Sequence, residues 1–506
     1  MAWKEGYAMG RRRVRWRTAS WRGRSLVLTT ATTLTTAAAA TLAAAALCTA
    51  LAPPDHATLA GAQLAAVGTQ PRAAGTPEPY AFADDATTVE GTADNTDSVR
   101  LEPGKAYKSS IERDGKLYYR LELDATANAY VSVTAVPGAG ETVSYGDGIR
   151  VSVQDGNSRN CSSSATAHFG ATQSSHPVAA WGAREIGSDQ FACQTAGTYY
   201  VVVDRSGTEG SSSGDWDLEL TYVSEPGLRK AGPTSAAEAW NSASPDALSG
   251  DPETRGGGAG FTGATSLRQG VWQDAITPGQ TLFYKVPVDW GQQLYTTTEL
   301  GSTDSGGDYL GNALAMSLYN PVRGFVDDVG SGYDGSQRSA ELDPLPPVTY
   351  ENRYARDNRV TGMRFAGSYY LVVHLAEQVA GKFGDGPFGL TLRVRVDGTA
   401  QAGPVYAGPA QPRDAFDVTS GDLDEAAGAD GGVGGDGDGA GGGSDTATMK
   451  LIAAAGIGSG SVLVLALGMW TLVARRRAGT ASSGEAVTVP APRTKAHRDH
   501  RAPRHR

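Results

Sequence analysis

The sequence predicts an all-β protein built from two tandem β-sandwiches, with a signal helix before them and one transmembrane helix after them. Apolar and polar residues alternate in runs of about eight that are rich in Tyr, Val and Thr, which is typical of strands with one buried face. Gly, Asp and Ser turns follow about every ten residues, and no long amphipathic helix pattern competes. An octapeptide also recurs, as AGTYYVVV at residues 196–203 and AGSYYLVV at residues 366–373, which indicates a duplicated unit.

Charge is distributed unevenly along the 506 residues. The net charge is −10, but residues 1–24 carry seven Arg, one Lys and one Glu, and residues 475–506 carry eight Arg, one Lys, one Asp and one Glu. Each end is therefore +7 and the part between them is −24. A nucleic-acid-binding protein places basic residues on its folded part. We therefore expect no nucleic-acid partner, and we expect the basic ends to serve membrane targeting.

Residues 1–62 have the layout of an export signal. Seven Arg residues precede an uncharged stretch, rich in Ala, Leu and Thr, that runs from Ser25 to Pro54. This matches a positive n-region followed by an apolar h-region. Cleavage after Ala52 or after Ala62 fits the small-residue rule, and an uncleaved anchor helix is the alternative.

Residues 450–474 form the predicted transmembrane helix. The stretch Leu451–Ala474 is uncharged, and its helix would reach roughly 36 Å, enough for a hydrocarbon core of about 30 Å. The stop-transfer residues Arg475, Arg476 and Arg477 follow, which predicts a cytoplasmic tail and an extracytoplasmic location for everything before the helix. Gly456 and Gly460 form a GxxxG pattern that permits helix packing, and with it a weak homodimer.

The repeat extends beyond the octapeptide. Four further pairs of strand-like segments occur in the same order: KLYYRLEL (116–123) with TLFYKVPV (281–288), AYVSVTAV (129–136) with QLYTTTEL (293–300), GIRVSVQDG (148–156) with ALAMSLYNP (313–321), and DWDLELTYV (215–223) with PFGLTLRVRV (387–396). A Pro-Gly turn precedes the first member of each set, at Pro103-Gly104 and Pro278-Gly279. In the Tyr pair of each octapeptide, alternation sends one ring to the core and the other to the surface.

The predicted organisation follows from these patterns and from composition shifts. Segments rich in Gly, Ala, Ser and Pro have the composition of linkers, and the acidic Gly-rich stretch after the second unit has nothing to bury. The predicted parts are a signal segment (1–62), a linker (63–94), a first sandwich (95–224), a linker (225–267), a second sandwich (268–398), a disordered stalk (399–449), a membrane helix (450–474) and a tail (475–506).

Two cysteines lie in the part expected outside the cell. An oxidising exterior favours a disulfide between Cys161 and Cys193 over a metal pair. Two unpaired buried thiols are the alternative.

The sequence holds no strong catalytic or cofactor motif. GSSSG at 210–214 matches G-x-S-x-G, but it lies between two predicted strands, and a nucleophile elbow needs a helix after it. His168, His176 and His374 have no partner at metal-ligand spacing, and we interpret His374 as a residue of a sheet face. Two Asp-rich stretches, 302–309 and 327–335, could supply oxygen ligands to Ca²⁺, but neither has the spacing of an EF-hand loop. We expect no cofactor and no metal site.

The segments of each unit resemble the bacterial pre-peptidase C-terminal domain. The order of the Tyr-rich strand, AGTYYVVV and the Gly-rich turn into DWDLELTY carries this resemblance, which covers about residues 95–224 and 268–397. It implies a jelly-roll-like β-sandwich in each unit of a membrane-anchored surface protein of actinobacterial type. The family's acidic residue before the Tyr pair is matched by Asp114, displaced by one or two positions, and by nothing clear before Tyr284.

These expectations favour a binding role over catalysis. We expect a non-enzymatic, single-pass membrane protein of the bacterial envelope that binds an envelope protein or glycan outside the cell. The alternatives are an accessory component of a secreted peptidase or hydrolase, which the resemblance implies, and an anchored subunit of an envelope complex. A hydrolase would need a catalytic domain, and no segment of that size remains after the predicted parts are subtracted.

Overall fold

A computed structural model describes residues 78–428, apart from residues 139, 163, 188–189, 238, 247 and 305–306. The described residues belong to one compact unit that begins at Arg72. The predicted signal (1–62), the helix with Gly456 and Gly460, and the tail with Arg475, Arg476 and Arg477 lie outside them. Within the described part, no helix is both long and apolar enough to span a membrane.

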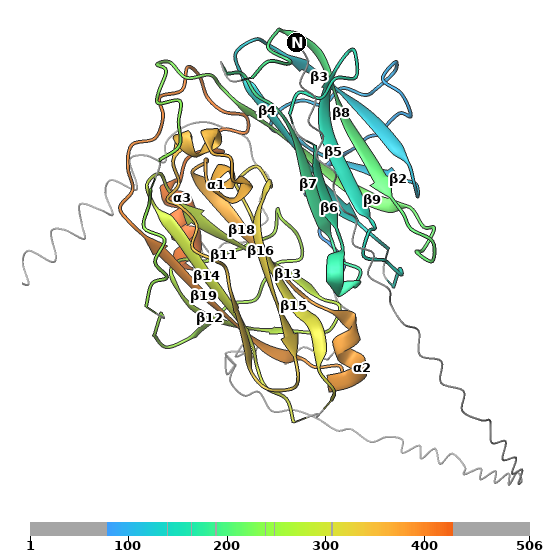
Figure 1. The fold of residues 1–506 in the computed structure, drawn as a ribbon, viewed down its shortest axis with the longest axis vertical. Coiled ribbons are helices and arrows are strands. Elements are labelled where there is room, and N and C mark those ends of the chain that lie inside the picture. The colour runs from blue at the N-terminus through green and yellow to red at the C-terminus, as the bar shows by residue number, and fades with distance from the viewer. Residues whose placement is uncertain are drawn as a thin grey trace, which may run out of the picture. The chain divides into compact units, whose positions relative to one another are not determined.

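The described part is all-β, with two sandwiches of two sheets each (Figure 1). The first sandwich contains β1 (Thr87–Thr88), β2 (Ala106–Ile111), β3 (Lys116–Leu123), β4 (Asn128–Val136), β5 (Gly148–Asp155), β6 (Ala165–His168), β7 (Val178–Arg184), β8 (Gly197–Ser206) and β9 (Trp216–Glu225), with the 3₁₀ turn η1 (Gly170–Thr172) before β7. Its sheets have the strand orders β1-β2-β9-β4-β7 and β3-β8-β5-β6.

The second sandwich contains β10 (Glu253–Thr254), β11 (Thr265–Ser266), β12 (Gly270–Ile276), β13 (Thr281–Val288), β14 (Gln293–Leu300), β15 (Leu310–Tyr319), β16 (Phe325–Tyr333), β17 (Arg338–Glu341), β18 (Gly367–Leu375) and β19 (Phe388–Asp397). Short helices connect or follow them: η2 (Tyr350–Tyr354), α1 (Asn358–Gly362), η3 (Glu377–Val379), α2 (Ala380–Phe383) and α3 (Ser420–Ala427). The sheet orders are β10-β12-β19-β14-β17 and β11-β13-β18-β15-β16.

The two sandwiches have the same backbone plan. Strands β2 to β9 correspond one by one to β12 to β19, because the strand orders of the two pairs of sheets match. The registers match as well: Lys116 pairs with Asp204 where Thr281 pairs with His374. Equal registers between strands that are distant in the sequence require the whole unit to have the same plan. The structure therefore supports the duplication that the sequence indicates.

The recurring octapeptide has the same local structure in both sandwiches. Gly197 and Gly367 begin β8 and β18 with φ of 155° and 130°, a region that side chains other than hydrogen rarely allow. The first Tyr of each pair is buried and donates to a carbonyl four residues earlier, Tyr199 to Thr195 at 2.6 Å and Tyr369 to Phe365 at 2.8 Å. The second Tyr of each pair is only half-buried, as alternation predicts.

A second glycine pair reveals that each repeat begins earlier than the sequence indicated. A Cβ on Gly91 would lie 2.8 Å from the Tyr119 hydroxyl, and one on Gly257 would lie 2.8 Å from the Tyr284 ring. Each glycine thus lets an extended segment cross the same Tyr of the strand below. These segments, near β1 and near β10 and β11, fall within the predicted linkers 63–94 and 225–267, so part of each linker belongs to a sandwich.

Two other expectations differ from the structure. Pro103-Gly104 precedes β2, whereas Pro278-Gly279 precedes β13, so the two turns are not equivalent; the counterpart of the second turn is the turn at Asp114-Gly115 before β3. Residues 399–428 of the predicted stalk are also packed rather than free: Phe416 is buried in the second core, and α3 has a Thr419 capping box. Local composition could not show these tertiary contacts.

Candidate functional site

The site begins with the contact between the two sandwiches, here called the junction. The outer face of the β1-β2-β9-β4-β7 sheet contributes Tyr130 and Glu219, which alternate with core residues along β4 and β9. Opposite them lie residues from the β11-β13-β18-β15-β16 sheet and its loops. Tyr80, Phe261, Phe283, Tyr319 and Val372 form one buried cluster that also includes Ala179 of β7. The faces that meet are therefore not the equivalent faces of the repeat.

Three ion pairs cross the junction in the same direction. Each has its Glu on the first sandwich and its Arg on the second: Glu219 with Arg323, Glu225 with Arg353 and Glu185 with Arg364. The first two Glu side chains are fully buried. Since an unpaired buried charge is strongly unfavourable, these pairs fix which surfaces meet.

Glu219 is held by groups from two other segments, the stretch before β1 and the β15–β16 turn. Its carboxylate accepts from the Arg323 guanidinium, from the Tyr80 hydroxyl at 2.7 Å and from the Ala83 amide at 2.8 Å. Arg323 lies in the turn from β15 to β16 with φ of 57°. Burial lowers the Arg323 pKa, but the Glu219 charge, the nearby Tyr80 and Tyr370 and the hydrogen bond to Glu219 together outweigh burial, and the net pKa is raised. Arg323 therefore keeps its charge in the junction.

Glu225 is at the centre of the second ion pair. Arg353 donates to it at 2.8 Å, Asn128 at 2.6 Å, and the hydroxyls of Tyr130 and Tyr406 at 2.8 and 2.9 Å. Burial raises the Glu225 pKa, but the Arg353 charge and these hydrogen bonds outweigh burial and lower it overall. Tyr406 lies beyond the second sandwich, so the segment after β19 also ties the two halves together.

Two histidines, one from each sandwich, stack at the junction. The rings of His176 and His374 have centroids 4.3 Å apart at an angle of 23°. Nδ1 of His176 donates to the Ser174 carbonyl at 2.7 Å. The nitrogens of His374 contact the hydroxyls of Thr281, at 3.0 Å, and Ser174, at 2.9 Å. Burial lowers the His176 pKa to about 4, and burial followed by the His176 charge lowers the His374 pKa well below its usual value.

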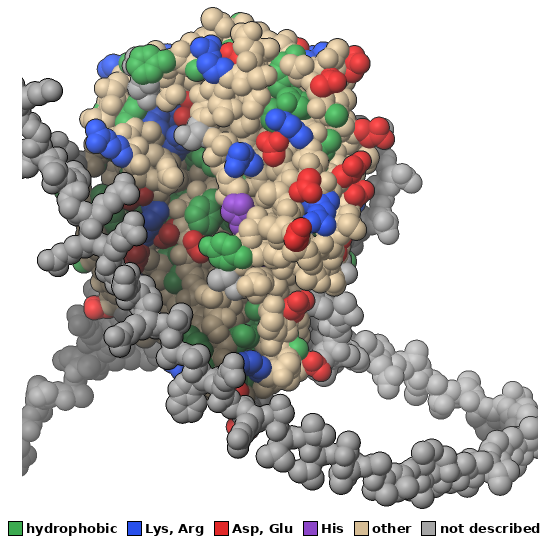
Figure 2. All heavy atoms as spheres, turned by 45° about the vertical axis from the view of Figure 1, so that its right-hand side comes forward, with side chains coloured by type: hydrophobic (Ala, Val, Ile, Leu, Met, Phe, Trp, Pro, Cys, Tyr) green, Lys and Arg blue, Asp and Glu red, His purple; other side chains and the backbone are tan. Residues whose placement is uncertain are grey.

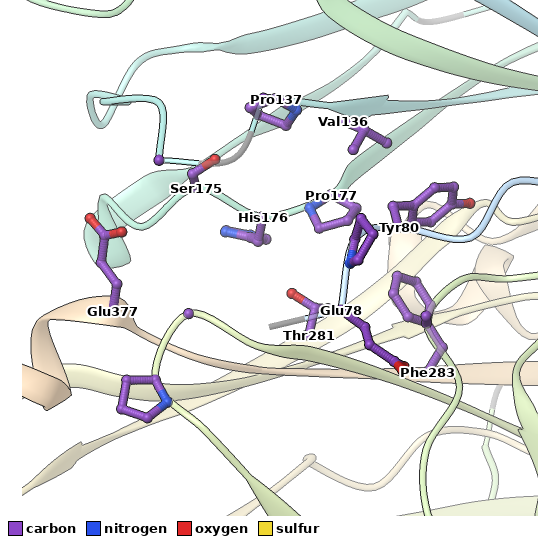
Figure 3. Close-up of a pocket in the computed structure, with 16 residues that line it drawn as sticks. Glu78, Tyr80, Val136, Pro137, Ser175, His176, Pro177, Thr281, Phe283 and Glu377 are labelled. Carbon is purple, nitrogen blue, oxygen red and sulfur yellow. The ribbon is translucent and has the colours of Figure 1, made fainter. Parts of the chain in front are cut away.

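A small pocket of about 280 Å³ lies beside this stack (Figure 3). His176 and Pro177 lie over Thr281 of β13, the rings of Tyr80 and Phe283 lie together at one end, and Glu377 lies at the opposite end. Its walls combine proline, valine and aromatic carbons with the polar groups of Glu78, Ser175 and Glu377. This volume is slightly below the usual range for small-molecule sites, about 300 to 1,000 Å³.

Ser174 and His374 resemble a nucleophile and base, but their surroundings do not suit catalysis. The Ser174 hydroxyl lies 2.9 Å from His374 Nε2, and the other ring nitrogen meets a Thr hydroxyl rather than a carboxylate. Ser174 is fully buried, so a substrate carbonyl cannot reach its Oγ while the junction is closed. Its hydroxyl also accepts from the Glu377 amide at 3.1 Å. The pair links the sandwiches.

The GSSSG stretch is a loop between β8 and β9, as interpreted from the sequence. Ser212 exchanges hydrogen bonds with the backbone of Thr142. Ser211 donates to the buried carboxylate of Asp147, which also accepts from Ser144 and Thr208. Burial raises the Asp147 pKa, but these hydrogen bonds outweigh it and the net pKa is lowered. The serines fasten a loop, with no histidine bonded to them in the described part.

The Asp-rich stretch at 327–335 is used in ion pairs. Asp327 pairs with Arg359 at 2.8 Å and Asp334 with Arg338. Part of the other stretch, 302–309, lies outside the described residues. Among the described residues, no group of three His, Cys, Asp or Glu could hold a metal ion.

Cys161 and Cys193 form a disulfide with Cα atoms 5.3 Å apart, within the range that this bond requires. Both are buried in the first core. The bond ties the segment after β5 to the segment before β8. Arg184 donates to the Cys193 carbonyl at 2.8 Å, which fixes the same corner.

The second sandwich has a sheet face equivalent to the face of the first sandwich that forms the junction, and the segment between the sandwiches covers it. Tyr295 of β14 corresponds to Tyr130, and Arg393 of β19 corresponds to Thr221. Arg393 donates to the Leu248 carbonyl at 2.9 Å, and Arg395 donates to the Asp246 carbonyl at 2.8 Å. The segment between the sandwiches therefore lies over this face, with a gap of about 230 Å³ beneath it.

Comparison with known proteins adds little. No family model matches the chain, and no curated protein matches it. Among solved structures, the CUB1-EGF-CUB2 domain of human MASP-1/3 has 9% identity and a TM-score of 0.14, covering 57% of this chain and 99% of that one. The tandem CBM22-1-CBM22-2 domain of Paenibacillus barcinonensis Xyn10C has 10% identity and a TM-score of 0.14, covering 55% and 82%. Scores this low do not establish a common fold.

Proposed function

We propose that this protein is a non-enzymatic, membrane-anchored binding protein of the bacterial envelope, whose two sandwiches act as one body and bind through the junction pocket. The carrying observation is the junction itself. Three Glu–Arg pairs, two of them with a fully buried Glu, hold two sandwiches at fixed faces and leave an apolar-walled pocket between them. A rigid pocket between domains is a common place for ligand binding.

The junction changes how duplication would serve binding. Two sandwiches on a flexible linker would act as separate weak binders that gain from effective concentration. Here the outer face of the first sandwich is occupied by the second, and the matching face of the second is covered by residues 244–246 and 248. We therefore propose one composite site rather than two equivalent ones.

The location is part of the proposal. The export signal at 1–62, the helix at 450–474 and the following arginines would place the sandwiches outside and the tail inside. Each sandwich would be a jelly-roll-like domain of the pre-peptidase C-terminal type. The strand orders support this because, counting β2 to β9 as eight strands, they form sheets 1-8-3-6 and 2-7-4-5.

Topology has a direct test. Protease added to intact cells should remove the sandwiches and spare a tag placed after Arg506. Digestion of that tag in intact cells would overturn the proposed orientation.

Partner chemistry is an envelope protein or glycan with exposed cationic groups. Figure 2 shows many acidic side chains gathered on part of one face, with a few basic ones between them. Long-range attraction of a cationic partner would fade as salt rises, because the Debye length falls from about 10 Å at 0.1 M to about 3 Å at 1 M.

The deciding experiment incubates the full-length protein with isolated envelope fractions and measures both retention and release of peptide or sugar. We expect retention without bond cleavage. Ser175→Trp fills the pocket and should weaken retention at least tenfold, whereas Ser213→Trp, in the exposed loop before β9, should leave it unchanged. Turnover that disappears in Ser174→Ala or His374→Gln would instead favour the hydrolase alternative.

A further inference from the structure

We propose that the His176–His374 stack is an acid-sensitive latch, and that acid opens one end of the junction and widens the pocket beside it. The inference concerns how the junction moves and does not depend on what the pocket binds. It begins with placement: His176 belongs to the loop before β7 of the first sandwich, and His374 belongs to β18 of the second. The stack is thus a contact that separation of the sandwiches must break.

The closed geometry suits neutral rings. A carbonyl oxygen only accepts, so Nδ1 of His176 carries the hydrogen that bonds to Ser174, and Nε2 is an acceptor in the neutral ring. The rings lie 4.3 Å apart by centroid. Two positive charges at that separation repel each other, and the repulsion is stronger in a buried place than in water.

The charged groups around the stack are few. Glu377, on η3 of the second sandwich, and Glu78, in the segment before β1, line the same pocket as His176. The neighbours on the other packed elements are uncharged: Thr281 of β13, Ser174, and the Phe169 ring, whose centroid lies 5.3 Å from that of His176. The two carboxylates would attract a protonated imidazole, and separation of the rings would let each imidazole turn toward them.

Protonation is linked to opening because the open state binds protons more tightly. An exposed imidazole has a pKa near 6.5, and the buried His176 has one of about 4. Above about pH 6.5 His176 is neutral in both states, so closure of the junction releases no proton. As pH falls from 6.5 toward 4, closure must remove a proton from the ring and becomes less favourable. For His176 the opening constant rises about 20-fold between pH 7 and pH 5 by this linkage, and protonation of His374 acts in the same direction.

The opposite end of the junction should stay closed over the same pH range. His176 lies two residues before Val178 of β7, which pairs with Ala135 of β4, and Ala135 pairs in turn with Leu218 near the start of β9. Glu225 is the last residue of β9, so the Glu225–Arg353 pair lies at the other end of this strand from the stack. Burial raises the Glu225 pKa, but the Arg353 charge and the hydrogen bonds to the carboxylate outweigh burial, so the net pKa is lowered. At an acidic pH that is still above the Glu225 pKa, the histidine end of the junction would open while the Glu225–Arg353 end stays closed, as in a hinge motion.

Hydrogen exchange of the full-length protein tests the latch. After correction for the intrinsic pH dependence of exchange, residues 174–178 and 279–283 should lose protection at least tenfold between pH 7.5 and pH 5, while residues 222–225 and 352–354 keep theirs. Equal protection of the first group at both pH values, or simultaneous loss in both groups, would overturn the proposal.

A variant pair isolates the histidines. The double variant His176→Phe/His374→Phe keeps two stacked rings but cannot titrate, so its exchange should change less than twofold over the same range. His168→Phe, an exposed position in β6, should behave as the unchanged protein. Retention of the full pH effect in the double variant would overturn the latch.

Direct titration covers the case in which the double variant fails to fold. The rate of histidine C2-hydrogen exchange, measured by mass spectrometry, reports the pKa of each ring in the unchanged protein. Both rings should show midpoints clearly below 6.5. A midpoint near 6.5 for either ring would show that it is not closed in the junction and would overturn the proposal.

Discussion

Glu219 of β9 and Arg323 of the β15–β16 turn, 104 residues apart in the chain, form a buried ion pair that joins the two sandwiches. The repeat explains why this contact has no second copy among the described residues. The position that corresponds to Glu219 in β19 is Thr391, because Lys108 pairs with Glu219 where Gln273 pairs with Thr391. The position that corresponds to Arg323 is Ser158, which has the same left-handed backbone, with φ of 61°. The unused faces thus lack both charges, and a second sandwich pair cannot add in the same way.

Arg323→Ala should destabilise the protein by about 3 to 5 kcal/mol, because it leaves Glu219 charged and buried. The double variant Glu219→Gln/Arg323→Met should lose much less, since no charge stays unpaired. Urea unfolding, followed by tryptophan fluorescence, measures both. Equal losses in the single and double variants would contradict a buried pair.

Arg353→Met should reduce the pH dependence of stability on the acid side. A carboxyl whose pKa is lowered on folding contributes stability that is present above its unfolded pKa, near 4.3, and is lost as pH falls through the folded value. Glu225 loses its charged partner in this variant, so the loss of stability between pH 5 and pH 3 should be smaller than in the unchanged protein. Unfolding free energies at half-unit pH intervals provide the comparison, and identical slopes would contradict the assignment.

Gly91→Ala and Gly257→Ala should each destabilise the protein by about 1 to 3 kcal/mol, the usual range for overpacking. The added methyl group meets Tyr119 in the first case and Tyr284 in the second. Gly389→Ala, on β19 with open space around its Cβ position, is the matched control and should change stability by less than about 0.5 kcal/mol. Thermal unfolding of the three variants measures these changes. A neutral result for Gly91→Ala or Gly257→Ala would contradict the equivalence of these two positions in the repeat.

Tyr199→Phe and Tyr369→Phe should have similar effects, since each removes one hydrogen bond to a carbonyl four residues earlier. The expected loss is about 1 kcal/mol for each. Tyr118→Phe, whose ring is on the opposite face of β3 from the core, serves as the control. A large difference between the first two variants would indicate that the two corners are not equivalent in energy.

Removal of the disulfide by Cys161→Ala/Cys193→Ala should cost about 3 to 4 kcal/mol in the chain-entropy estimate for a separation of 32 residues. Thiol titration of the denatured, unreduced protein should find neither cysteine reactive. Labelling of both would show that the bond does not form.

The sequence by itself determined the all-β class, the duplication and the main strands. These depend on local information: alternation gives the buried face of a strand, and positions such as Gly197 and Tyr199 recur with the conformation that requires them. The predicted bounds of KLYYRLEL and TLFYKVPV coincide with β3 and β13. The pairing of Cys161 with Cys193 was equally readable, because few alternatives exist for two cysteines.

Only the tertiary structure decided which faces of the sandwiches meet and what lies between them. Glu219, Arg323, His176 and His374 are ordinary polar residues in the sequence, and nothing local marks Ser174 as the partner of a histidine 200 residues away. The bounds of the repeat also depended on tertiary contacts, since the segments near Gly91 and Gly257 have linker composition but lie across a strand. Alternation shows which face of a strand is buried in the core of its own sandwich. It contains no information about a second domain, because burial against another sandwich depends on the summed contacts of many residues that are distant in the sequence.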